Sequence, residues 1–275
     1  MLNLFKENIK ITNDNIILAT PLIVFMWLSS LYISYSKGAV NSLPLLILTG
    51  VTTLFMTSAF LAGWFYMVKK AIQLSKQVFV LDTDKAKATL NLIKTIPTGI
   101  GKYFLSFVGQ IIFSMLIFII TGLITFKLGM ILIGNVGIDP IQLKSVLSSS
   151  IDVRAFLDTL TIDQLIKLNN WNLLLMLTTG ILSFLLMLWI PEILFQTKNP
   201  LTALFKSIGK IFKKPMKSIK LFLFITILNF VISFVNTFSM LNPFIYFVMM
   251  VMYFYFLVYL VMLIFTYYDR EFTEQ

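Results

Sequence analysis

The sequence predicts an all-α, polytopic membrane protein. The chain has 275 residues, of which 58% are hydrophobic and only 12% are charged. Its apolar runs reach the length of about 20 residues that a helix needs to cross a bilayer. Six such runs occur, and lysines are concentrated in two of the connections between them. These features together predict six transmembrane helices, two cytoplasmic amphipathic helical connections and a single integral membrane domain over residues 1–275.

The six predicted spans follow one another with short or charged connections. They are Ile16 to Ser36, Leu43 to Val68, Tyr103 to Phe126, Trp171 to Phe195, Leu221 to Phe238 and Phe244 to Tyr268. At the end of the second span, Trp64 and Tyr66 precede Lys69 and Lys70, which is the usual order of aromatic and cationic residues at a membrane interface. The first run is long for a signal-peptide core and has no clear small-residue cleavage site, so we expect it to be retained as a span.

The charge of the connections predicts their side of the membrane. Residues 69–102 and 198–220 carry seven lysines each, whereas 127–170 has four basic and four acidic residues and the first connection has only Lys37. Lysine-rich loops stay in the cytoplasm, so we expect 69–102 and 198–220 inside, 127–170 outside and both termini inside, in a bacterial-type cytoplasmic membrane. Topology then explains most of the net charge of +10, and no nucleic-acid partner is expected.

The first cytoplasmic connection predicts two short surface helices. They are interrupted at Asp82 to Asp84. The segment from Pro97 to Gly101 is predicted to break the helix before the third span. Each has an apolar stripe at helical spacing, formed by Ala71, Leu74, Val78 and Leu81 in the first and by Ala86, Leu90 and Ile93 in the second.

The second cytoplasmic connection predicts a helix that lies on the membrane surface. Asn199 is a suitable N-cap, Pro200 fits the first helical position and Pro215 is expected to end the helix. Apolar residues are predicted to line one face, namely Leu201, Leu204, Phe205, Ile208 and Phe212. Lysines are predicted to line the opposite face, namely Lys206, Lys210, Lys213, Lys214 and Lys217.

Two further segments are expected to fold outside the bilayer. Residues 1–15 place apolar side chains loosely at helical spacing and are interpreted as a segment along the inner surface; these are Leu2, Phe5, Ile9 and Ile11. The outside segment 127–170 is expected to hold two or three short helices. One of them starts at Asp139-Pro140, and another follows the capping box from Thr161 to Gln164.

The five lysines of the second connection are candidate ligands for anionic lipid headgroups or for a membrane protein partner. A lysine near an anionic membrane surface contributes about 1 kcal/mol. Alternatively, these lysines only orient the chain in the bilayer, and we favour this simpler explanation because the positive-inside bias needs nothing more.

Polar side chains within the spans are the other candidates. Glu192 lies near the inner end of the fourth span, and an ionisable group there is a functional hypothesis by default. The alternative that we favour is a structural pair with Lys198 or contact with water. Gln110, Asn229 and Asn236 are candidates for lining a polar path, but such amides more often join helices by hydrogen bonds.

The sequence lacks residues that several kinds of chemistry require. It contains no cysteine and no histidine, which removes thiol chemistry, the usual general base and the commonest transition-metal ligand. No phosphate-binding glycine loop, carboxylate pair or metal-ligand cluster is evident. We therefore expect no enzymatic activity, no metal and no cofactor. A lipid-modifying enzyme that uses Glu192, Asp82 or Asp84 is the weakest alternative, because no nucleophile and base can be named.

The stretch from Trp189 to Phe224 resembles a pattern in poorly characterised bacterial membrane families. It combines a proline-containing acidic span end, the surface-helix core from Ala203 to Ser207 and a basic run into the next span. It is similar to the YciC-like proteins and to the membrane domain attached to some glycerophosphodiester phosphodiesterases. The resemblance implies a six-span architecture and no reaction, since no segment outside the spans is large enough for the phosphodiesterase domain.

The function expected from these features is a non-catalytic scaffold or accessory protein that engages lipids or partner proteins. The alternative is a transporter or permease component. It is suggested by a weak repeat in which Lys102 to Leu105 align with Lys220 to Leu223, and its path is predicted to be lined by Gln110, Asn229 and Glu192.

Overall fold

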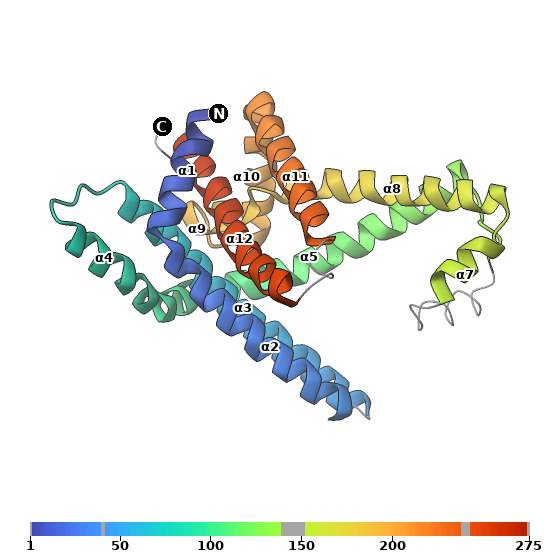
Figure 1. Cartoon of the computed structure of the whole chain (residues 1–275), viewed down its shortest axis with the longest axis horizontal. Coiled ribbons are helices and arrows are strands. Elements are labelled where there is room, and N and C mark those ends of the chain that lie inside the picture. The colour runs from blue at the N-terminus through green and yellow to red at the C-terminus, as the bar shows by residue number, and fades with distance from the viewer. Residues whose placement is uncertain (1, 40–41, 139–151, 238–242, 274–275) are drawn as a thin grey trace. The chain divides into compact units, whose positions relative to one another are not determined.

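The computed structural model describes residues 2–39, 42–138, 152–237 and 243–273, and these residues form helices, turns and loops without a strand (Figure 1). The prediction of an all-α protein is confirmed. The helices are α1 (Leu2–Asp14), η1 (Ile16–Leu18), α2 (Ala19–Ala39), α3 (Leu43–Ser75), α4 (Asp82–Leu90), η2 (Asn91–Thr95), α5 (Ile96–Leu132), α7 (Asp152–Thr159), α8 (Ile162–Leu186), α9 (Trp189–Phe195), α10 (Pro200–Lys213), α11 (Pro215–Thr237) and α12 (Pro243–Phe272). As predicted, the described residues include six helices that are long and apolar enough to cross a membrane.

The fourth predicted span is not one continuous helix. It is divided into α8 and α9, and the helix is interrupted at Met187 and Leu188. Pro191 explains the position of the break, because its ring clashes with the carbonyl of residue i−4, which is Met187, and it lacks the N–H that would bond that carbonyl. The seven residues of α9 thereby form a separate short helix.

The described residues cluster into two compact units, Met1–Phe113 with Leu185–Gln275, and Ser114–Phe184. In the first unit, α3, α5 and α12 meet through stacked rings, with the centroid of Phe65 at 5.7 Å from that of Phe107 and at 5.6 Å from that of Phe265. The single membrane domain stays a prediction.

The N-terminal segment forms α1, which lies alongside α12 (Figure 1). Its buried residues include Leu4, Asn8, Ile11 and Thr12, while Ile9 is 47% exposed. The side-chain amide of Asn8 donates to the carbonyl oxygen of Tyr259 at 3.0 Å. Of the apolar residues named from the sequence, Ile11 is therefore buried against protein, whereas Ile9 is exposed.

The connection between the second and third predicted spans contains one short α-helix, α4, rather than two. α3 continues past Val68 to Ser75, so Ala71 is buried in a long helix instead of lying on a separate surface helix. Leu74 of that predicted stripe is half-buried in α3, and Val78 and Leu81 are exposed in the loop that follows. The expected break at Pro97 is also wrong: α5 begins at Ile96, directly after η2, and Pro97 lies in its first turn.

The second unit contains the predicted capping box. The N–H of Thr161 donates to Oε1 of Gln164 at 3.0 Å, and the N–H of Gln164 donates to Oγ1 of Thr161 at 3.3 Å. This capping box begins α8, so the helix starts well before the expected span.

The indole N–H of Trp171 in α8 donates to the carbonyl of Gly134 at 3.1 Å. α7 is a short helix as expected, whereas the helix start predicted at Asp139-Pro140 lies outside the described residues.

Candidate functional site

The short helix α9 forms the centre of the site. Trp189, Glu192, Ile193 and Leu194 are each at most 2% exposed. The indole N–H of Trp189 donates to the carbonyl of Pro200 at 2.7 Å, which fixes the start of α10 against α9. Asn199 caps α10 as predicted, because its side-chain oxygen accepts from two N–H groups in the first turn. The sequence around the Pro191 break thus places an acidic residue in the interior and directs the basic helix α10 toward it.

Glu192 is fully buried and is paired with Lys210 of α10. Its Oε2 lies 2.6 Å from Nζ of Lys210 and accepts from the hydroxyl of Tyr268 at 2.5 Å. Nζ of Lys210 also lies 2.5 Å from the Tyr268 hydroxyl, so the three groups close a triangle between α9, α10 and α12. The structural pair expected for Glu192 is present, but its partner is Lys210 and not Lys198.

A second ion cluster joins the end of α10 and the start of α11 to the end of α12. Nζ of Lys214 and Nζ of Lys217 lie 2.9 Å and 2.8 Å from carboxylate oxygens of Glu271. Next to it, the hydroxyls of Ser218 and Tyr267 are 3.0 Å apart. Three of the five candidate lysines therefore bind acidic residues of the same chain, and their first role is to fasten the basic segment to α9 and α12.

The remaining side chains divide α10 into three faces. Small and aliphatic residues are buried against the protein, namely Ala203, Leu204, Ser207 and Ile211. Leu201, Phe205 and Phe212 form an apolar stripe and are 42%, 67% and 64% exposed. Lys206 and Lys213 are exposed and form no ion pair with any residue that the structure describes. At about 100° per residue, the three sets lie roughly 120° apart around the helix axis.

This arrangement differs from the two-faced helix expected from the sequence. Leu204 faces the protein, whereas Leu201, Phe205 and Phe212 do not. Ala203 and Ser207 permit the close packing, because their short side chains let α10 approach α9. Lys210 then projects from the edge of the buried face to Glu192.

The polar residues proposed for a transport path differ in their exposure. Asn229 is exposed on α11 and Gln110 is half-buried on α5. The hydrogen bonds of Glu192 within the described chain go to Lys210 and Tyr268. The side chain of Asn236 lies outside the described residues. None of these positions favours the path predicted for a transporter.

The acids proposed for an enzyme lie in two different environments. Asp82 and Asp84 are exposed in the first turn of α4, while the Glu192 carboxylate is engaged with Lys210 and Tyr268. Among the described residues, no group of three or more acidic side chains is placed to hold a metal ion.

Sequence reasoning missed Tyr268 and Glu271 as partners of the basic helix. Both lie in the motif from Tyr267 to Glu271, where a span ends in aromatic and charged residues. A long run of lysines without an acid requires counter-charges from elsewhere in the chain, and Glu271 lies just beyond the last predicted span. That imbalance was the only sequence signal for this pairing.

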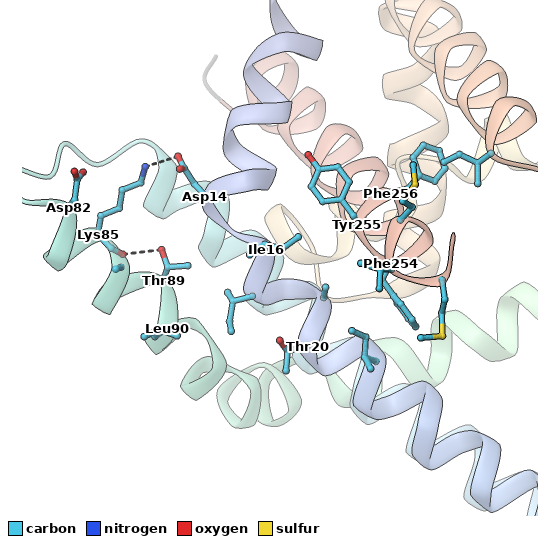
Figure 2. Close-up of a pocket in the computed structure, with 18 residues that line it drawn as sticks. Asp14, Ile16, Thr20, Asp82, Lys85, Thr89, Leu90, Phe254, Tyr255 and Phe256 are labelled. Atoms are coloured by element: carbon cyan, nitrogen blue, oxygen red, sulfur yellow. Dashed lines mark hydrogen bonds and ion pairs between the residues drawn. The ribbon is translucent and has the colours of Figure 1, made fainter. Parts of the chain in front are cut away.

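A large apolar pocket of about 1190 Å³ lies in the first unit (Figure 2). Its lining comes mainly from η1, α2, α4 and α12, and includes Ile16 of η1, Thr20 of α2 and Phe254 of α12. The ion pair between Lys85 and Asp14, at 2.6 Å, lies at one edge. The pocket therefore combines an apolar interior with a charged rim, which is suited to an amphipathic molecule.

No family model, no curated protein and no solved structure matches this chain. The resemblance to the YciC-like proteins and to the phosphodiesterase membrane domain stays a prediction carried by residues Trp189 to Phe224. The geometry of α9, α10 and α12 is therefore the basis on which a function can be assigned.

Proposed function

We propose that this protein is a non-catalytic scaffold or accessory protein of a cytoplasmic membrane, which engages anionic lipids at the inner surface through α10. The observation that carries the proposal is the division of α10 into three faces. One face is packed on the protein, a second is apolar and exposed, and the third carries Lys206 and Lys213. A helix at the boundary of protein, hydrocarbon and headgroups meets these three environments.

Energetics favours this placement of α10. Burying a large apolar side chain that water would otherwise contact contributes about 1.5–3 kcal/mol, so water is a poor environment for Phe205 and Phe212. Lysine stems extend along apolar surface while their ammonium groups reach the headgroups. The pairs of Lys210 with Glu192 and of Lys214 with Glu271 hold α10 in this orientation.

The proposed topology places both termini in the cytoplasm. It rests on six spanning helices, which put both ends of the chain on one side, and on the lysine-rich segments 69–102 and 198–220. α10, α4 and the termini then share the inner surface, where anionic lipids and cytoplasmic partners are present.

Replacing Lys206 and Lys213 together by glutamine is expected to weaken binding of an anionic lipid about 30-fold, at about 1 kcal/mol per lysine. Native mass spectrometry of the full chain in mild detergent, titrated with phosphatidylglycerol, measures this change. Lys210, Lys214 and Lys217 stay intact, because substituting them would also break the ion pairs that hold α10.

The matched control removes two lysines of the segment predicted to lie outside, Lys127→Gln with Lys167→Gln, and so has the same net charge. The control is expected to bind the lipid as the wild type does. Equal loss in both variants would show that only total charge matters and would refute the role of α10.

We propose a hydrocarbon chain of a membrane lipid as the occupant of the apolar pocket. Residues of a predicted span line it, and a lipid chain is the apolar molecule present at that depth. Thr20→Trp is expected to fill part of the volume and to reduce the number of lipids that copurify in mild detergent. Thr52→Trp, on the exposed face of α3, is the control. An unchanged lipid count in Thr20→Trp would exclude a bound chain.

A further inference from the structure

A second group of lysines gathers around two buried tyrosines of the first unit. The ring centroids of Tyr66 on α3 and Tyr103 on α5 are 5.8 Å apart. Nζ of Lys70 and Nζ of Lys102 lie 5.7 Å and 5.6 Å from the Tyr66 centroid, and Nζ of Lys198 lies 5.7 Å from that of Tyr103. Three segments that are distant in sequence therefore place ammonium groups around one aromatic pair.

Lys69 adds a fourth ammonium group and ties the cluster to α9. Its Nζ donates to the carbonyl of Leu194 at 2.6 Å, and the hydroxyl of Tyr103 donates to the same oxygen at 3.1 Å. Lys69 is close enough to Lys70 and Lys102 for the positive charges to repel one another. The end of α9 thus helps to hold like charges together at this place.

Within the described chain, no carboxylate forms an ion pair with any of these four lysines. Other lysines of this unit do have such pairs, namely Lys76, Lys85, Lys210, Lys214 and Lys217. Asp269 acts on Lys69 electrostatically, but its Oδ2 lies 2.5 Å from Nζ of Lys76. The tyrosine faces attract the ammonium groups only weakly and leave their charges in place.

We propose that Lys70, Lys102 and Lys198, supported by Lys69, bind a phosphate group. Lysine ammonium groups bind phosphate as point charges, and three chain segments converge here without a carboxylate to compete. The lysines stand at the end of α3, in the first turns of α5 and just before α10, where spans give way to cytoplasmic connections. The phosphate comes either from a phospholipid headgroup or from a free anion. This site shares no residue with the lipid-facing lysines of α10.

The test compares two probes on the full chain in neutral detergent. Isothermal titration with a short-chain phosphatidylglycerol and with inorganic phosphate is done in the Lys206→Gln/Lys213→Gln background, so that α10 does not contribute. Adding Lys102→Gln and Lys198→Gln, both exposed, is expected to weaken binding about 30-fold. Lys102→Arg with Lys198→Arg keeps both charges and is expected to keep the affinity within a few fold.

The two probes distinguish the sources of the phosphate. Loss with the lipid probe assigns a headgroup, and loss with inorganic phosphate alone assigns a free anion. The proposal is overturned if neither probe binds the background protein, if the glutamine variant binds both probes unchanged, or if Lys127→Gln with Lys167→Gln weakens binding equally. Since α10 is already neutralised, failure here leaves the lipid contact of α10 to be tested separately.

Discussion

Glu192→Gln is expected to lower the free energy of unfolding by about 3–5 kcal/mol, because it leaves the ammonium group of Lys210 in the interior without its counter-charge. Lys210 is 18% exposed and Glu192 is fully buried, so solvent screens the pair little. Tyr268 donates to the lost carboxylate and loses its charged acceptor as well. Reversible unfolding of the purified protein in detergent measures the change.

A double variant separates the pair from simple damage. Glu192→Gln combined with Lys210→Met removes both charges, so it is expected to be more stable than Glu192→Gln alone. Asp163→Asn is the control, because its ion pair with Lys167 is an exposed i,i+4 contact with Asp163 72% exposed. A Glu192→Gln protein as stable as the Asp163→Asn protein would contradict the geometry described for α9.

Trp189→Ala is expected to have a similar effect, at about 3–5 kcal/mol, because it leaves a large cavity beneath α10. Trp189 is 1% exposed, and the variant also loses the hydrogen bond to the carbonyl of Pro200. Thermal unfolding in detergent compares it with Trp27→Ala, whose side chain is 63% exposed on α2. Equal melting temperatures for the two variants would show that α9 is not the support of α10.

Helices and their ends could be predicted from the sequence because their causes are local. Runs of apolar residues indicated the six spanning helices, and Asn199 and the Thr161 to Gln164 box marked helix starts. Pro191 was visible as well, but its consequence, a separate buried helix, depends on what surrounds the break. The helix ends at Ser75 and Ile96 were missed because packing extended helices past the apolar runs.

The site could be predicted only in part, because its contacts join residues far apart in sequence. Glu192 lies 18 positions from Lys210 and 76 from Tyr268, and helical periodicity carries no signal at those separations. The assignment of residues to the faces of α10 was wrong for another reason. Leu204 packs on protein while Phe205 is exposed, and both settings favour apolar residues when the protein lies in lipid.

The proposed role of α10 depends on where its exposed faces lie, and site-directed labelling measures this directly. The chain has no cysteine, so Phe205→Cys and Lys206→Cys each create a single labelling site without background. In vesicles containing phosphatidylglycerol, a nitroxide at position 205 is expected to be reached by oxygen, which concentrates in hydrocarbon, and shielded from a water-soluble nickel complex. A nitroxide at position 206 is expected to show the reverse. If both positions are equally open to the nickel complex, α10 does not lie on the membrane and the proposed function is wrong.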